Sequence, residues 1–259
     1  MTITASQVKE LREITGVGMM ECKEALVTTN GDMEKAIEEL RKKGLAKAAK
    51  KADRETSEGY IKIDCEGSKC YVLSLTCETD FLAKSEGFQK LVSKLMQMLK
   101  DGKSIEEMEQ IKQESVLELG ENMTIKAAQV VEGSKIESYV HSNGKLAAVV
   151  VSKKSDTDSE KLKQVAMHIT ATNPEFLSTT DISVEAVEKE KAIQMEIMKN
   201  DPKMAGKPDV VLENILVGKM NKFKDEISLL EQAFVINPDL KVKQFIGEDN
   251  LEKFFRFSI

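Results

Sequence analysis

The sequence is poor in the residues from which catalytic and metal sites are usually built. Among 259 residues there are two histidines, four cysteines and no tryptophan, and aromatic residues amount to only 5%. Core volume must therefore come from aliphatic side chains and from the 13 methionines. So few histidines and cysteines leave little material for an acid–base or metal constellation.

An excess of positive charge is missing as well. Lys and Arg number 38 against 44 Asp and Glu, a net charge of −6, whereas proteins that bind nucleic acid usually carry a basic excess. The sequence also lacks an apolar stretch of the ~20 residues that a membrane span requires, and it lacks a signal peptide. We expect a cytoplasmic protein that binds neither nucleic acid nor membrane directly, and whose cysteines are reduced.

Residues 1–44 predict a small module of three short helices. Thr4 and Gln7 have the spacing of a capping box, which begins the first helix. Turn residues at 16–18 and 30–32 separate the helices, and apolar residues recur at helical spacing between them. A helical unit this small is typical of a recognition module.

Met19 and Met20 follow the first of these turns directly. Helical spacing favours at least one of them as a core residue of the module. In the alternative, both face solvent, where the flexible methionine side chain suits a docking surface.

Residues 45–56 predict a basic helical linker. Seven of the fourteen residues from 41 to 54 are basic, and few are large and apolar. This pattern is typical of a solvated helix. It also favours an electrostatic contact with an acidic partner, and the two interpretations are compatible.

The rest of the chain predicts an α+β core made of two similar parts. Residues 57–135 show a hairpin turning at 66–68, a helix with an apolar stripe, a second capped helix, and a strand after Gly120-Glu121-Asn122. Residues 136–259 repeat the order, with Asn143-Gly144 as a two-residue turn and a helix that stops before Pro174. This recurrence predicts an internal duplication.

The second part is longer because of a charged segment at about 183–224, which predicts an inserted helical hairpin of the coiled-coil kind. The apolar positions expected to pair across it are Val184, Val187, Ile193 and Ile197 with Val211, Ile215 and Met220. These helices either pair between two copies of the chain, giving a homodimer, or dock on their own core.

Three candidate sites for chemistry are weak. His168 lies in a helix and is expected in the core, whereas His141 lies beside a turn and is expected in solvent. Cys65, Cys70 and Cys77 share one hairpin, where the first two can face each other, but their spacings of four and six residues do not fit zinc. No glycine-rich phosphate loop is present. We therefore expect no metal, no cofactor and no catalytic residue.

Phe81 stands at the predicted junction of a strand and a helix, directly after Glu78, Thr79 and Asp80. A phenylalanine at such a junction more often belongs to the core. The acidic and polar residues before it favour the alternative, in which Phe81 projects into solvent and contacts a partner.

Several segments resemble the elongation factor Ts family. Residues 11–26, LREITGVGMMECKEAL, resemble the family's N-terminal signature throughout. Residues 77–84, CETDFLAK, are similar to its T-D-F-V-A motif, with Leu82 where the family usually has Val. The segments GLAKAAKK at 44–51 and AMHI at 166–169 also resemble family sequence.

This resemblance implies a ubiquitin-associated-like three-helix module, a linker, and a duplicated α+β core with a coiled-coil insertion. It implies a guanine nucleotide exchange factor in translation elongation, not an enzyme. Such a factor binds elongation factor Tu carrying GDP and promotes GDP release so that GTP can bind. In the family, an Asp-Phe pair that matches Asp80 and Phe81 enters the partner's GTPase domain and disturbs its Mg²⁺ and phosphate site.

The resemblance also implies which residues touch the partner. The motif that displaces Mg²⁺ matches Thr79, Asp80, Phe81 and Leu82. The other matched partner-binding positions are Arg12, Met19, Met20, Lys23, Leu119, Gly120, His141, Val235 and Ile236. Some members continue into a C-terminal helix that also touches the partner, and we expect that contact to be missing here.

Two other classes of protein remain open at this point. Three-helix units of this type also occur in modules that bind ubiquitin or nascent chains, although a simple tether has no need of Asp80 and Phe81. A thiol enzyme built on the hairpin cysteines would need an exposed thiolate of low pKa.

Overall fold

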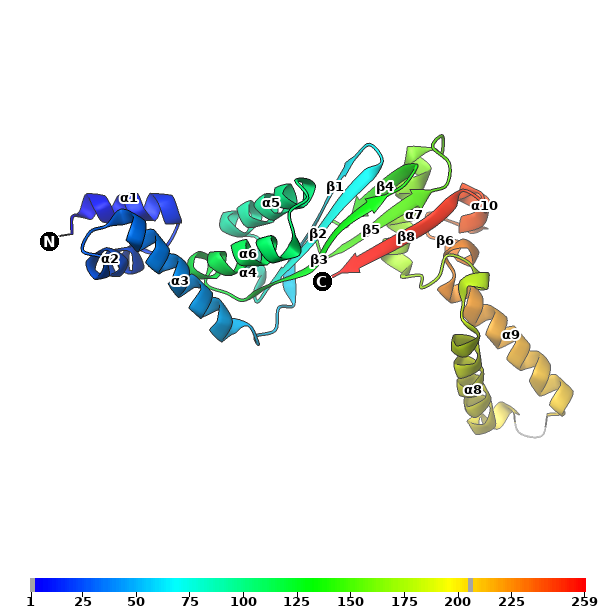
Figure 1. Ribbon diagram of the computed structural model, residues 1–259. Helices are drawn as coiled ribbons and strands as arrows, with labels where there is room; N and C mark the ends of the chain where they lie inside the picture. The colour runs from blue at the N-terminus through cyan, green and yellow to red at the C-terminus, as the bar shows by residue number, and fades with distance from the viewer. Residues whose placement is uncertain (1–2, 205–206) are drawn as a thin grey trace. The chain divides into compact units, whose positions relative to one another are not determined.

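The computed structural model describes residues 3–204 and 207–259 (Figure 1). The chain contains both helices and strands, with three helices before the first strand, which is consistent with the predicted α+β class. The chain divides into two units. The first unit runs up to Val131 and includes Ser142–Leu146 and Phe257–Ile259, and the second comprises Glu132–His141 and Ala147–Arg256.

The first unit begins with three helices, α1 (Ala5–Thr15), α2 (Met19–Thr28) and α3 (Met33–Lys51), drawn in blue in Figure 1. The predicted capping box of Thr4 and Gln7 is confirmed, since each side chain accepts from the other residue's backbone N–H. The small core of these helices is apolar and consists mainly of Val8, Leu11, Val17, Cys22, Ala25, Leu26, Ala36 and Leu40.

α3 continues without a break through the predicted linker, as far as Lys51. The interpretation of this segment as a solvated helix is wrong for one face, because Gly44 and Ala48 are buried. A Cβ added at Gly44 would lie 3.2 Å from the carbonyl oxygen of Glu114 in α6 (Ile105–Leu119), so the two helices approach closely there. Leu117 of α6 also joins the core of the three N-terminal helices.

The first sheet has the order β1-β2-β3, with strands Glu58–Glu66, Lys69–Cys77 and Met123–Glu132. β1 and β2 form the predicted antiparallel hairpin. Beyond β2 come a single-turn helix, α4 (Asp80–Ala83), and the longer α5 (Glu86–Lys100), which packs against β2. The predicted apolar stripe of α5 is confirmed as its buried face, formed by Phe88, Leu91, Val92, Leu95 and Leu99.

Cys65 and Cys70 form a disulfide, so the expectation that all four cysteines are reduced is wrong for this pair. The register of the hairpin places the two residues directly opposite each other, which is the arrangement that lets their sulfur atoms meet. Cys22 and Cys77 are free and buried.

The second sheet has the order β4-β5-β8, with strands Lys135–Val140, Leu146–Ser152 and Leu251–Ser258. The predicted two-residue turn between the first two strands is wrong, because the last paired residues are Val140 and Ala147. Gly144 adopts a left-handed conformation (φ 69°) within this longer connection.

The sheet's helix is α7 (Ser159–Thr172), which packs against β4 and ends before Pro174 as predicted. The later part of the second unit contains short elements: η1 (Thr179–Asp181), η2 (Pro202–Met204), η3 (Leu229–Glu231), β6 (Ala233–Phe234), β7 (Asn237–Lys241) and α10 (Val242–Ile246). Its core joins α7 to these elements through Val165, Ile169, Leu229, Phe234 and Val242.

Two longer helices form the predicted hairpin, α8 (Val184–Asn200) and α9 (Asp209–Ile227). Most of the predicted pairing stripe is wrong, because Val184, Ile193, Ile197 and Val211 are exposed. The helices are rotated from the expected orientation, so that Gln194 and Met198 turn inward on α8 and Met220 is buried on α9. The contact is partly polar, since Lys219 Nζ donates to Gln194 Oε1 over 3.1 Å.

Candidate partner-binding site

Phe81 is the most exposed large apolar side chain in the described part of the protein, with 84% of its surface accessible. It lies in α4, where the next two residues, Leu82 and Ala83, are buried. A single helical turn that directs those two side chains inward leaves Phe81 pointing outward. This exposure forgoes roughly 1.5–3 kcal/mol that burial of such a side chain contributes to stability. Of the two sequence interpretations, the solvent-facing one is correct.

Thr79 begins the turn that carries Phe81. Its backbone is extended and its hydroxyl oxygen accepts from the backbone N–H of Leu82 over 3.2 Å, which makes it the N-cap of α4. We call residues 79–83 the Phe81 turn. Because threonine is a favourable N-cap residue, the sequence itself favours one helical turn here.

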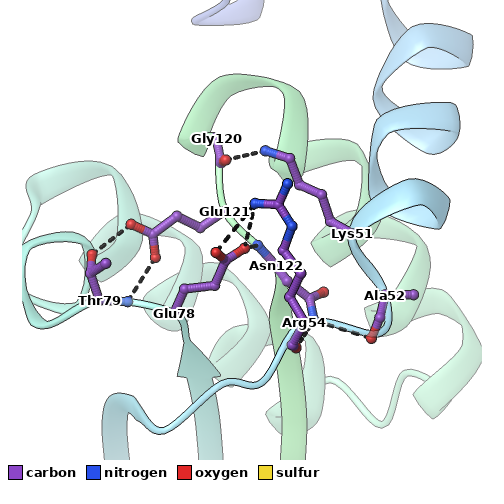
Figure 2. Close-up of polar contacts among 8 residues, drawn as sticks. All are labelled: Lys51, Ala52, Arg54, Glu78, Thr79, Gly120, Glu121 and Asn122. Carbon is purple, nitrogen blue, oxygen red and sulfur yellow. Dashed lines mark hydrogen bonds and ion pairs between the residues drawn. The ribbon is translucent and has the colours of Figure 1, made fainter.

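A second contact to Thr79 comes from the loop between α6 and β3 (Figure 2). The carboxylate of Glu121 accepts from the backbone N–H of Thr79 over 2.9 Å and from its hydroxyl over 2.5 Å. The neighbouring residues form the reverse contact, in which the carboxylate of Glu78 accepts from the backbone N–H of Asn122 over 2.7 Å. Two carboxylates thus join the end of β2 to the start of β3.

The end of α3 and the residues after it reach the same loop (Figure 2). The side-chain amide of Asn122 donates to the carbonyl oxygens of Ala52 and Arg54 over 3.3 and 2.8 Å, and Lys51 donates to the carbonyl oxygen of Gly120. The guanidinium of Arg54 lies 3.4 Å from Glu78. Basic residues of the linker therefore contact an acidic loop of their own unit.

Asp80, the residue before Phe81, is held in an ion pair on the surface. Lys84 Nζ lies 2.7 Å from its carboxylate, one helical turn further along. The hydrogen bond from Lys84 lowers the pKa of Asp80 below its ordinary value. Asp80 is therefore a charged and accessible carboxylate beside the exposed ring.

The predicted contact residues of the N-terminal helices all face solvent. Arg12 and Lys23 are exposed on α1 and α2. Met19 and Met20 are 42% and 67% accessible, so the expectation that at least one of them fills the core is wrong. The reason is their place in the first turn of α2, whose core face begins only at Cys22.

Two exposed apolar residues of the same module were not predicted, Ile14 on α1 and Val27 on α2. Ile14 follows Leu11 by three positions, which is the spacing of a core residue. Helical periodicity therefore predicts that Ile14 is buried and gives no sign of its exposure. Val27 follows the buried Leu26 directly, and this change of face is the signal that could have identified it.

The turn after α6 lies beside the Phe81 turn. Gly120 ends α6 in a left-handed conformation and is exposed. Leu119 is partly buried against the apolar core of the first sheet and its helices. Glu121 connects this turn to Thr79. The structure thus brings together two predicted groups that are about forty residues apart in sequence, Thr79–Leu82 and Leu119–Gly120.

The remaining predicted residues belong to the second unit. His141 is exposed, as expected, and its Nδ1 lies 3.2 Å from the hydroxyl of Tyr139. Val235 and Ile236 are half-exposed at the tip between β6 and β7.

His168 is in the core of the second unit, as predicted. Its Nδ1 accepts from the backbone N–H of Val235 over 3.1 Å, and its Nε2 donates to Gln232 Oε1 over 2.8 Å. Burial lowers the pKa of His168, although the hydrogen bond to Gln232 opposes this effect. A neutral histidine therefore fixes the base of the tip that carries Val235 and Ile236.

The described residues contain little that could perform covalent chemistry. Within residues 3–204 and 207–259, no group of three or more His, Cys, Asp or Glu side chains is placed to hold a metal ion. Burial, and next the negative charge of Glu121, raise the pKa of Cys77 to about 12, so this thiol is not a nucleophile at neutral pH. In the same ranges, no helix has the length and apolarity to cross a membrane.

Comparison with protein families identifies a match over most of the chain. The model of the family described as elongation factor TS matches residues 78–259. The matched range begins one residue before the Phe81 turn and includes Glu121, His141 and the tip of Val235 and Ile236. Because this match covers well over half of the chain, the chain belongs to the elongation factor Ts family.

Proposed function

We propose that this chain acts on elongation factor Tu as a guanine nucleotide exchange factor. Its family consists of translation elongation factors, which in general promote nucleotide exchange on that GTPase. The exchange requires no covalent chemistry from the factor, in keeping with a site built of apolar and charged surface residues rather than nucleophiles.

The observation that carries the proposal is the exposed ring of Phe81. An apolar side chain that is 84% accessible, on a turn fixed by Glu121, is ready to enter an apolar pocket without first unfolding its surroundings. A rigid aromatic anchor loses little conformational entropy on binding, and a few such anchors usually dominate an interface. A purely structural role would place this ring inside.

Asp80 supplies the electrostatic part of the mechanism. Mg²⁺ in a GTPase bridges the nucleotide phosphates to the protein and neutralises their charge. In our proposal, Phe81 enters the partner beside that metal, and the charged carboxylate of Asp80 arrives with it. Displacement of Mg²⁺ weakens phosphate binding, and GDP leaves.

The N-terminal helices act as a separate docking surface in this proposal. Met19, Met20 and Ile14 expose apolar surface at neighbouring ends of α1 and α2, and Arg12 and Lys23 place positive charge on the same two helices. Leu119, Gly120, His141, Val235 and Ile236 are proposed as further contacts.

We also propose the domain organisation given by the sequence: a ubiquitin-associated-like module at 1–44, a linker at 45–56, and two core parts at 57–135 and 136–259. The two sheets support a duplicated core, because each has its first two consecutive strands paired and its last strand beside the second. The exposed apolar residues of α8 and α9 support pairing of two copies through the insertion. Light scattering of the intact chain at several concentrations tests that pairing.

The decisive experiment measures release of a fluorescent GDP from elongation factor Tu with and without the chain. We expect faster release that saturates with the chain's concentration and is opposed by added Mg²⁺. Linkage requires that GDP weaken binding of the chain by the same factor by which the chain weakens binding of GDP. If the chain's affinity for the partner is independent of GDP, the protein is a tether and the proposal is wrong.

A further inference from the structure

The turn that carries Phe81 is too short to hold its own shape. α4 contains four residues, whereas isolated helices of fewer than ~12 residues are marginal in water. Its ion pair between Asp80 and Lys84 is exposed on both sides and contributes little to stability. The direction of Phe81 must therefore depend on contacts outside the turn.

Glu121 makes the contact best placed to do this. Its carboxylate accepts from both the backbone N–H and the hydroxyl of Thr79. The same hydroxyl oxygen accepts from the backbone N–H of Leu82. Because the Thr79 hydroxyl donates its hydrogen bond to Glu121, a lone pair of its oxygen is directed toward the N–H of Leu82, and the cap of the turn is oriented. Bonds to an ionised acceptor are also about twice as strong as neutral ones.

Glu121 is itself well anchored. The residue before it, Gly120, closes α6 with a hydrogen bond to Val116, and the residue after it, Asn122, is buried. Asn122 is bound through its backbone to Glu78 and through its side chain to Arg54. The carboxylate of Glu121 thus extends from a fixed loop to a turn that needs support.

We infer that Glu121 is a positioning residue for Phe81, which sets the direction of the ring without touching the partner. The inference rests on the proposed function, because Phe81 is the residue that acts on the partner. The orientation of Phe81 can nevertheless be measured on the free chain. The positioning role of Glu121 and the exchange function can therefore be refuted independently of each other.

The absence of tryptophan from the sequence makes this measurement direct. In the variant Phe81→Trp, the indole at position 81 is the only one, and time-resolved fluorescence anisotropy reports its motion. Adding Glu121→Ala should increase the amplitude of nanosecond local motion at least about twofold, because the cap loses its orienting acceptor. Glu106→Ala, at the opposite end of α6, is the matched control and should leave the motion unchanged.

Circular dichroism and thermal melting establish that the compared variants are folded. If Glu121→Ala fails to fold, Glu121→Gln replaces it, because the amide retains one acceptor for Thr79 and should give an intermediate increase. An unchanged anisotropy decay in a folded Glu121→Ala or Glu121→Gln variant would overturn the inference.

The second readout separates positioning from contact. With Phe81 restored, Glu121→Ala should lower the maximal rate of GDP release about tenfold, which corresponds to the loss of one well-oriented cap. The concentration giving half the maximal effect should change less than about twofold, because the docking surfaces are intact. An unchanged maximal rate despite increased motion would contradict a positioning role in exchange. If the parent chain does not stimulate release at all, the proposed function fails and the anisotropy result stands.

Discussion

The two three-stranded sheets have the same strand order, but they lead into their first helices in different ways. In the first sheet, β2 continues through the Phe81 turn to α5. In the second, β5 continues to α7 through residues 153–158, KKSDTD, in which every side chain is polar. An exposed aromatic ring occurs in only one of the two connections.

Both connections are tied to the loop before the last strand of their sheet, but by different groups. In the second sheet, the carbonyl oxygen of Asn250 accepts from the backbone N–H of Lys153 and the hydroxyl of Ser152, over 2.8 and 2.7 Å. In the first sheet, the carboxylates of Glu78 and Glu121 make the connection. The carboxylate contacts are therefore found in the connection that exposes Phe81 to solvent. We interpret them as compensation for the stability that the exposed ring does not contribute.

The largest effect should come from removing the side chain that distinguishes the two connections. Phe81→Ala should lower the maximal rate of GDP release at least about thirtyfold, as expected for an interface anchor. Its melting temperature should be nearly unchanged, because the ring is exposed. Phe88→Ala is the matched control, since that ring is buried and its loss should cost about 3–5 kcal/mol of unfolding free energy. A large drop in melting temperature for Phe81→Ala would refute the contact role.

A smaller effect is expected from the docking surface of the N-terminal helices. The double variant Met19→Ala, Met20→Ala should weaken binding to the nucleotide-free partner about tenfold, because two exposed apolar anchors are lost. The maximal rate of GDP release should remain, since the Phe81 turn is unaltered. Isothermal titration calorimetry and saturation kinetics separate the two quantities, and an unchanged affinity would exclude this surface as a contact.

Removing one hydroxyl from each connection, at Thr79 in the first sheet and at Ser152 in the second, should affect GDP release in the first case only. Thr79→Val removes the hydroxyl that contacts Glu121 and Leu82, and should slow GDP release about fivefold. Ser152→Ala removes the hydroxyl that contacts Asn250, and should cost about 1 kcal/mol of unfolding free energy without changing release. Chemical denaturation and stopped-flow release measure both. Slower release in Ser152→Ala would remove the functional distinction between the connections.

The smallest effect concerns pH, and it should be confined to the second unit, which contains both histidines. The folded pKa of His168 lies below the ordinary value of 6.5, so the unfolded state binds more protons as the pH falls through that value. The unfolding free energy of this unit should therefore decrease below about pH 6.5, by up to about 1 kcal/mol per pH unit. Hydrogen exchange at pH 7.5 and 5.5 measures it, and His168→Gln should reduce the dependence.

Local sequence signals predicted several helix starts and one apolar helix face well, because their causes are local. The caps at Thr4 and Ser104 and the apolar stripe of α5 depend on residues within one or two turns of each other. The family resemblance added the motif at Thr79–Leu82, and the family match covers that motif. Residue patterns alone left Phe81 undecided between core and surface.

Features that depend on distant contacts could not be predicted in this way. Glu121 meets Thr79 across 42 positions, and a single acidic residue after a helix has many other uses. The faces of α8 and α9 were misassigned because apolar residues lie all around both helices, so periodicity does not identify the side that pairs. The solvation of α3 was misjudged because Gly44 approaches α6 closely and Ala48 is buried, a packing contact that the basic composition of the segment does not reveal.

The continuous α3 has a practical consequence for truncation of the protein. A chain shortened to begin after α3 would uncover Leu117 and the neighbouring surface of α6, which the N-terminal helices now cover. Such a fragment would expose this apolar surface to solvent and should therefore aggregate, independently of any effect on partner binding. Removing α1 and α2 alone would instead expose the N-terminal part of the buried face of α3, at Ala36 and Leu40. The N-terminal helices therefore cover apolar surface of α6 in addition to the binding role proposed for them, and loss of activity in a truncated chain would not separate the two.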